Sequence, residues 1–158
     1  MPVTTIRPFN TFGPRQSARA VIPTIITQAL RQAEIKLGSL TPVRDLTYVK
    51  DTVRGFLSVA VSDSAVGEIT NVGAGKGISI GDLAQEILDL LEVDKPLRAD
   101  SQRVRPEQSE VFRLICDNAK AKKLIGWQPQ VTLREGLLDT LDFFRECVDR
   151  YKPESYSL

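Results

Sequence analysis

Short β-branched segments alternate with amphipathic helical stripes along the chain, and this alternation limits the fold more than any other feature. The clearest stripe lies near the C-terminus, where apolar side chains recur at three- and four-residue steps: Leu133, Leu137, Leu141, Phe144 and Val148. Strands that alternate with helices are typical of a parallel sheet covered by helices. The sequence therefore predicts a mixed α/β protein, and for 158 residues one domain is the default.

The predicted elements are short and closely spaced. Strands are expected over residues 3–7, 35–38, 45–49, 68–72 and 111–115. Helices are expected over residues 20–32 and 117–126, and from Asp51, Ser79 and Thr132 onward. Ser79 with Asp82 and Thr132 with Glu135 form capping boxes, and Asp51 is predicted to cap its own helix.

The charge and the cysteines point to an ordinary cytoplasmic protein. The 21 basic and 20 acidic residues are mixed along the chain, so no segment is set aside for nucleic acid or membrane. No run is apolar enough to span a bilayer, and the first residues lack the pattern of a secretory signal. Cys116 and Cys147 show no metal-binding or disulfide spacing, so both are expected to be buried, reduced thiols.

The sequence contains no histidine. This absence excludes Ser-His-Asp and Cys-His catalysis and every metal site that uses an imidazole ligand. No metal site is expected.

A glycine-rich segment, GAGKG at residues 73–77, lies between a predicted strand and a predicted helix. Backbone N–H groups in that setting can bind a phosphate. However, Gly77 follows Lys76 where a triphosphate-binding loop has Ser or Thr, and Ile78 stands where the dinucleotide pattern has its third glycine. Both a phosphate site and a tight structural turn stay open, and the pattern favours the turn.

Three polar residues are candidate ligand contacts. Arg44 and Arg105 each adjoin an irregular segment, and a guanidinium can bind a diphosphate through two hydrogen bonds, although local chemistry alone favours a solvated or salt-bridged arginine at each position. Asn10 follows the first predicted strand, where ligands bind in open α/β sheets, or it begins an Asx turn.

Four segments, taken together, resemble one family. They are RPFNTFGPRQ at residues 7–16, RDLTYVKD at 44–51, NVGAG at 71–75 and LIGWQP at 124–129. In order and spacing they resemble the extended short-chain dehydrogenases that act as NAD-dependent nucleotide-sugar epimerases and dehydratases. Residues 16–30 resemble the bacterial UDP-N-acetylglucosamine 4,6-dehydratases in particular. The resemblance implies a partial Rossmann-type sheet of two strands plus the small α/β substrate domain of that family.

The resemblance also implies site residues. Asn10 would contact the diphosphate and the sugar, and Arg44 and Arg105 would clamp the diphosphate. The backbone of Ile35, Lys36 and Leu37 would hold the nucleobase, Glu110 lies near the ribose-binding acidic position, and Pro8 lies where the family's chain passes the nicotinamide. In the family the segment that matches residues 71–77 leads into a substrate-domain helix, which favours the structural turn.

The family's cofactor glycines and its Tyr-x-x-x-Lys pair precede everything that matches here, and none of Tyr48, Tyr151 and Tyr156 has a lysine four residues on. We therefore expect residues 1–152 to form the nucleotide-sugar-binding C-terminal domain and residues 153–158 a tail, with the NAD-binding domain absent. NAD, the cofactor of the intact family, is not expected to bind this chain alone, and the chain alone is expected to be inactive.

Three functions fit these expectations. The chain could bind a UDP-type sugar nucleotide as a module without catalysis. It could be one chain of a split or truncated enzyme whose N-terminal partner supplies NAD and the Tyr-Lys pair. It could also be a structural remnant that self-associates into a homo-oligomer, because strands 3–7 and 68–72 would normally join a larger parallel sheet.

Overall fold

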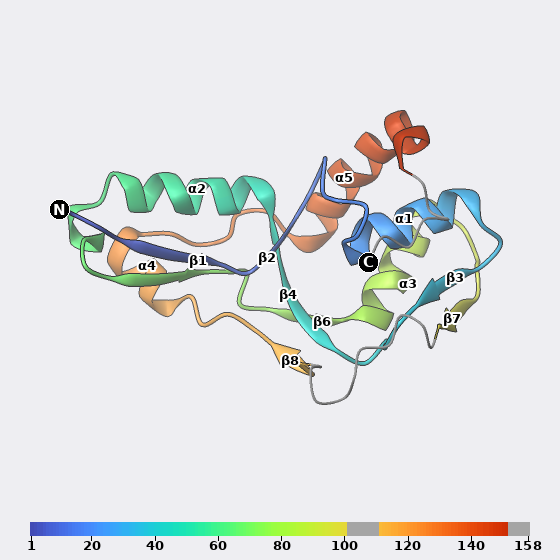
Figure 1. Cartoon of the computed structure of the whole chain (residues 1–158), viewed down its shortest axis with the longest axis horizontal. Helices are drawn as coiled ribbons and strands as arrows, with labels where there is room; N and C mark the ends of the chain where they lie inside the picture. Colours follow the sequence, from blue (N-terminus) through green and yellow to red (C-terminus); the bar gives the residue numbers. More distant parts are fainter. Residues whose placement is uncertain (101–110, 152–158) are drawn as a thin grey trace. The chain divides into compact units, whose positions relative to one another are not determined.

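The computed structural model describes residues 1–100 and 111–151 (Figure 1). The chain forms two compact units. Unit 1 consists of Met1–Phe12, Val43–Ile78 and Arg113–Leu133. Unit 2 consists of Gly13–Pro42, Ser79–Phe112 and Arg134–Leu158. Each unit thus combines three separate stretches of sequence, an arrangement that local periodicity does not reveal.

Unit 1 contains two small sheets. In the first, β1 (Thr5–Pro8) pairs in parallel with β5 (Ile69–Val72). In the second, β2 (Asn10–Phe12) lies beside β4 (Val43–Tyr48) in parallel, β4 also pairs with β6 (Gly77–Ser79), and β8 (Arg113–Leu114) pairs in parallel with the start of β4. The parallel β1–β5 pair confirms the predicted two-stranded, partial Rossmann-type sheet.

Three helical segments complete unit 1: α2 (Val49–Ala60), the 3₁₀ turn η1 (Asp63–Ala65) and α4 (Ala119–Ile125). Val72 of β5, Ala121 of α4 and Trp127 form a buried apolar cluster. Gly55 allows α2 to approach this cluster closely, because a Cβ there would lie 2.9 Å from Val72 Cγ1.

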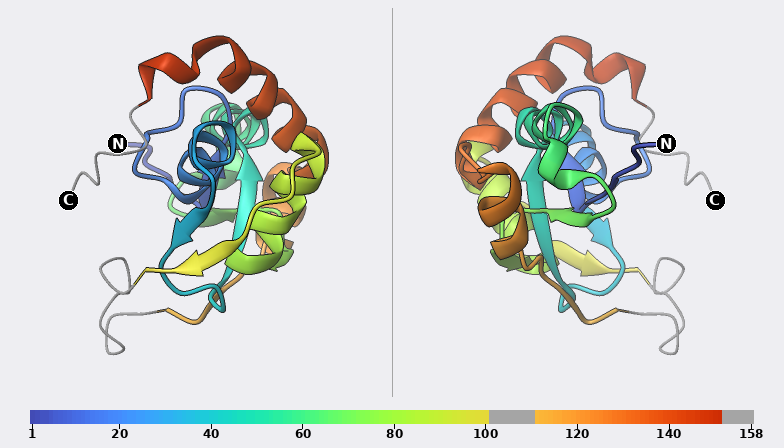
Figure 2. Two further views of the ribbon diagram at one scale, coloured as in Figure 1. Left: turned by 90° about the vertical axis from the view of Figure 1, so that its right-hand side faces the viewer. Right: turned by 90° about the vertical axis from the view of Figure 1, so that its left-hand side faces the viewer.

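Unit 2 is built on α1 (Val21–Arg31), α3 (Ile80–Leu91) and α5 (Leu133–Cys147), with the 3₁₀ turn η4 (Val148–Arg150) after α5. Strands β3 (Ile35–Leu37) and β7 (Leu97–Ala99) pair in parallel and lie side by side in Figure 2. The helices bury their apolar stripes, including Ile22, Ile25, Ile26, Leu83, Ile87, Leu137, Leu141 and Phe144.

Two local predictions about unit 1 were wrong. The first strand was expected to lead directly to Asn10, but β1 ends at Pro8 and Asn10 begins β2, in the other sheet. Asp51 was expected to cap a helix, but α2 already begins at Val49, and the Asp51 carboxylate accepts hydrogen bonds from the backbone N–H groups of Gln130 and Val131. Both differences arise from contacts between residues far apart in the sequence.

Candidate nucleotide-sugar site

Asn10 and Arg44 lie on neighbouring strands of one sheet. Strands β2 and β4 are paired with Asn10 opposite Leu46, so Arg44 is two residues along β4 from that position. Asn10 is exposed, and its Nδ2 donates to the Asp45 carbonyl at 3.1 Å. Since an amide nitrogen carries two hydrogens, one N–H of Asn10 stays available to a ligand. Arg44 is partly buried, and its Nη1 donates to the Val43 carbonyl at 3.1 Å.

The next residue on β4, Asp45, is completely buried. Its carboxylate accepts three backbone hydrogen bonds, from Ala74 at 2.9 Å, from Gly75 at 2.8 Å and from Cys116 at 3.0 Å. No lysine or arginine of the described chain forms an ion pair with it. Oriented N–H groups therefore take the place of a counter-ion. These contacts fix β4, the glycine loop and the segment after β8 to one another.

The glycine loop is structural. The Ala74 and Gly75 N–H groups, which a bound phosphate would need, already donate to Asp45. Gly75 has φ +73°, a conformation that favours glycine, and a Cβ on Gly73 would lie 2.4 Å from Cys116 Cβ. The two glycines therefore allow a tight turn that packs closely against Cys116. The predicted structural turn is confirmed, and this loop does not fit the pyrophosphate of a dinucleotide.

Both cysteines are buried free thiols, as expected. Burial, together with the negative charges of Asp45 and Asp117, raises the pKa of Cys116 to about 12. Cys116 therefore stays protonated near neutral pH and is not a nucleophile there.

In unit 2 the backbone of β3 is already hydrogen-bonded. Ile35 N–H donates to Pro96 at 3.0 Å, and Leu37 C=O accepts from Asp100 at 2.7 Å, so these two residues face β7. The opposite edge is occupied by the buried Gln28 side chain, whose Oε1 accepts from Lys36 N–H at 2.8 Å and whose Nε2 donates to Lys36 C=O at 3.1 Å. A nucleobase that used the Lys36 peptide would have to displace Gln28.

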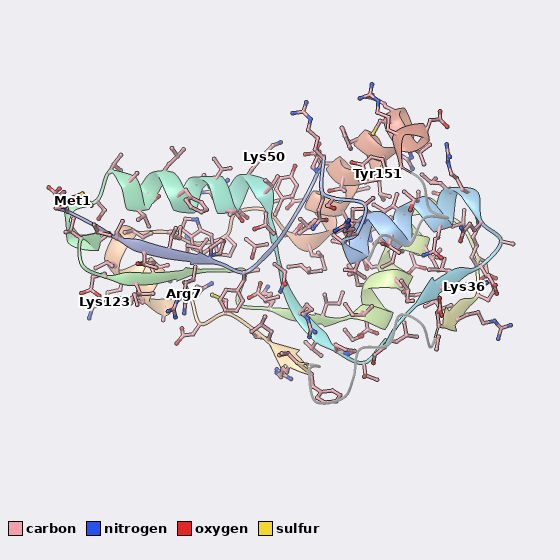
Figure 3. All side chains as sticks on the ribbon, in the orientation of Figure 1. Met1, Arg7, Lys36, Lys50, Lys123 and Tyr151 are labelled. Atoms are coloured by element: carbon pink, nitrogen blue, oxygen red, sulfur yellow. The ribbon has the colours of Figure 1, made fainter. Side chains whose placement is uncertain are left out.

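The remaining predicted site residues are placed as follows. The Lys36 side chain (Figure 3) is exposed, and its Nζ forms an ion pair with Glu34 Oε1 at 3.0 Å. Pro8 is exposed at the end of β1, opposite Val72. Arg105 and Glu110 lie outside the described residues. Asn10, Arg44 and Pro8 thus belong to unit 1, and Ile35, Lys36 and Leu37 belong to unit 2.

Sequence reasoning missed Asp45 and Gln28 as organising residues. For Asp45 a signal existed, because aspartate is unfavourable in a strand and this one stands in an otherwise strand-forming segment. For Gln28 the sequence contained no such signal, because a glutamine in an amphipathic helix is usually a surface residue.

Neither a metal site nor a membrane segment emerges from residues 1–100 and 111–151. No cluster there brings together three side chains from the usual set of metal ligands. No helix in the same residues combines the length and apolarity needed to cross a bilayer.

Comparison with known proteins gives consistent results. The family profile of GDP-mannose 4,6 dehydratase matches residues 1–140. The UDP-glucose 4-epimerase of Mycolicibacterium smegmatis is 34% identical over 146 residues, which cover 89% of this chain and 44% of the epimerase.

Solved structures agree. Epimerase Mth375 of Methanothermobacter thermautotrophicus superposes with a TM-score of 0.86 at 32% identity, covering 98% of this chain and 46% of that one. The UDP-glucuronic acid 4-epimerase of Bacillus cereus, solved with UDP-glucuronic acid and NAD, superposes with a TM-score of 0.83 at 25% identity. The match covers 92% of this chain and 46% of the epimerase chain.

This chain spans less than half the length of the curated relatives that it matches. Within that span, the matched profile, the shared identity and the shared fold agree with the four sequence segments. The chain therefore belongs to the GDP-mannose 4,6 dehydratase family, among the NAD-dependent nucleotide-sugar epimerases and dehydratases of the extended short-chain dehydrogenases.

Proposed function

We propose that this chain is the substrate-side half of an NAD-dependent nucleotide-sugar epimerase or dehydratase, and that it binds the diphosphate of a UDP-type sugar nucleotide through Asn10 and Arg44. The observation that carries the proposal is the pairing of β2 with β4, which holds these two side chains on neighbouring strands. Asn10 supplies an amide donor and Arg44 a guanidinium, the groups that suit a diphosphate.

The Asp45 contacts support this role. They tie β4 to the glycine loop and to the segment after β8 through backbone groups, so the strand that carries Arg44 is held in place before a ligand arrives. A preorganised arginine loses less conformational entropy on binding. Arg105 would complete the clamp and Glu110 would contact the ribose. The backbone of Ile35, Lys36 and Leu37 would contact the base, and at Lys36 the base would have to take the place of the Gln28 side chain.

Catalysis is proposed to need the other half of the family's chain. The glycine loop does not fit the pyrophosphate of NAD, because the Ala74 and Gly75 N–H groups of the loop already donate to the Asp45 carboxylate. Tyr48 does not fit the role of a general base, because it is buried against Phe12 with the ring centroids 5.6 Å apart. Pro8 would contribute at most one wall beside a nicotinamide that the other half holds, and the chain alone is proposed to be inactive.

Calorimetric titration of the chain with UDP and with UDP-N-acetylglucosamine tests the proposal. Arg44→Ala is expected to weaken binding by about tenfold or more, because it removes a charge-assisted contact. Arg113→Ala is the matched control: this exposed arginine lies on β8, beside β4, and its loss should change the affinity less than about twofold. No heat at millimolar ligand, or equal losses in both variants, would contradict the proposal.

A further inference from the structure

The peptide groups of β3 that face β7 are engaged in the sheet. The two strands pair in parallel, and in such a pair the N–H and the C=O of one residue point to the same edge. Ile35 N–H donates to the Pro96 carbonyl. Leu37 C=O accepts from Asp100 N–H, so Ile35 and Leu37 both turn their peptide groups to β7. Within β3, Lys36 alone turns its N–H and C=O to the other edge.

The Gln28 side chain occupies that other edge. Its Oε1 accepts from Lys36 N–H at 2.8 Å, its Nε2 donates to Lys36 C=O at 3.1 Å, and the residue is only 1% exposed. A primary amide offers an acceptor beside a donor, and each common nucleobase offers the same pair on its Watson–Crick edge. The Gln28 amide therefore makes the two hydrogen bonds that a base would make with this peptide.

The helix that carries Gln28 is tied to the segment before β7. There the Lys95 side chain donates through Nζ to the carbonyls of Ala29 and Gln32, at 2.6 Å each. These two carbonyls lie at the C-terminal end of α1, within four residues of Gln28. A base can therefore reach the Lys36 peptide only if the Gln28 side chain leaves by itself while α1 stays in place.

Displacement of Gln28 by a base brings no net hydrogen bond. The base would replace two bonds to the Lys36 peptide with two others of the same kind, and the freed Gln28 amide would lose both of its partners. A buried amide without partners costs free energy, so the exchange is unfavourable and the Gln28 amide keeps its place.

We propose that Gln28 is a specificity-determining residue that keeps β3 from selecting among nucleobases, so that the chain binds nucleoside diphosphate sugars as a class. This inference rests on the proposed function and narrows it. The diphosphate and the sugar select the ligand, and the base contacts β3 without hydrogen bonds to it. A site that reads its ligand through buried, matched hydrogen bonds behaves differently, because it rejects a mismatched ligand by orders of magnitude.

Calorimetric titration of the chain with UDP-glucose, CDP-glucose, GDP-glucose and ADP-glucose tests the inference, since these ligands differ only in the base. The dissociation constants should agree within about threefold. Two-dimensional NMR of the isotope-labelled chain gives a second readout. The Gln28 side-chain N–H signals should keep their chemical shifts at saturating UDP-glucose, because the amide keeps its partners.

Two substitutions remove the amide. Gln28→Met keeps the length of the side chain, and Gln28→Ala also opens space beside β3. In each variant that circular dichroism shows to be folded, the dissociation constants should spread over about tenfold or more, because a base can then bond to a Lys36 peptide that has lost its partner. A purely structural role of Gln28 would change all the affinities alike and leave their ratios unchanged.

Gln85→Ala is the matched control. This exposed glutamine lies on α3, and its Nε2 donates to Asp89 Oδ1 at 2.8 Å. Its loss should keep the dissociation constants within about threefold of one another, because Gln85 bonds to a side chain on its own helix.

Three results would overturn the inference: a wild-type preference of about tenfold or more for one base, a shift of the Gln28 side-chain signals on binding of UDP-glucose, or folded Gln28 variants with unchanged affinity ratios. All three require binding, so they leave the proposed function intact. An absence of heat with every ligand would instead contradict the proposed function, and this inference with it. If neither Gln28 variant folds, the wild-type titrations and the Gln28 signals decide.

Discussion

At the scale of single residues, the buried Asp45 carboxylate matters most to the candidate site. It is fully buried, and its hydrogen-bond donors are three backbone N–H groups and, at 3.4 Å, the Thr47 hydroxyl. Such a group stabilises the fold while all its partners are present and destabilises it when they are mismatched.

Replacement of this aspartate by its amide tests that balance. Asp45→Asn turns one acceptor oxygen into a donor that faces another donor, so we expect the free energy of unfolding to fall by about 2–4 kcal/mol. Urea unfolding followed by circular dichroism measures the change. Asp94→Asn, at an exposed position, is the matched control and should stay within about 0.5 kcal/mol of the wild type. Equal changes in the free energy of unfolding for the two substitutions would show that the Asp45 contacts with the backbone do not stabilise the fold.

The Cys116 thiol gives a pH-dependent prediction. Its pKa is about 12 in the folded chain against an ordinary value of 9.0, because of burial and the nearby carboxylates. The folded state thus keeps a proton that the unfolded state loses, and stability falls as pH rises from 9 toward 12. Urea unfolding at pH 8 and pH 10.5 should show a larger loss for the wild type than for Cys116→Ala. The same loss in both proteins would exclude the thiol as its source.

At the scale of elements, the sequence predicted the positions of helices well but did not predict which distant segments contact one another. The predicted helix at residues 20–32 and the Ser79 cap agree with α1 and with α3, where Ser79 Oγ accepts from Asp82 N–H at 3.0 Å. Periodicity and capping are local, so the sequence shows them directly. The contacts of Asp51 with Gln130 and of Asp45 with Gly75 span many residues, and no local pattern encodes them.

The glycine loop tests packing between elements. Gly73→Ala would place a methyl group 2.4 Å from Cys116 Cβ and 3.2 Å from an Asp45 oxygen, and both of these residues are buried. We expect a loss of about 2–4 kcal/mol in thermal or urea unfolding, because the loop or the Cys116 segment must move. Gly81→Ala is the control, since its nearest neighbour would be 3.5 Å away and its helical position favours alanine. A Gly73→Ala protein as stable as the wild type would contradict the close packing.

At the scale of the whole molecule, the sequence predicted the fold class through the family resemblance and not through its patterns alone. Alternating strands and helices indicate α/β, but the division into two interleaved units depends on which distant segments meet. The candidate site was predicted in the same way. Asn10 and Arg44 were singled out by residue type and family position, whereas the Asp45 network that supports them came only from the structure.

The most direct test of the central claim is to locate a sugar nucleotide on the isotope-labelled chain by two-dimensional NMR during titration with UDP-N-acetylglucosamine. We predict saturable shifts at the amides of Asn10 and Arg44 and their loss in Arg44→Ala, with the Ala74 and Gly75 amides little affected because Asp45 already binds them. An absence of shifts at millimolar ligand, or saturable shifts centred on the glycine loop, would contradict the account of this chain as a substrate-side half.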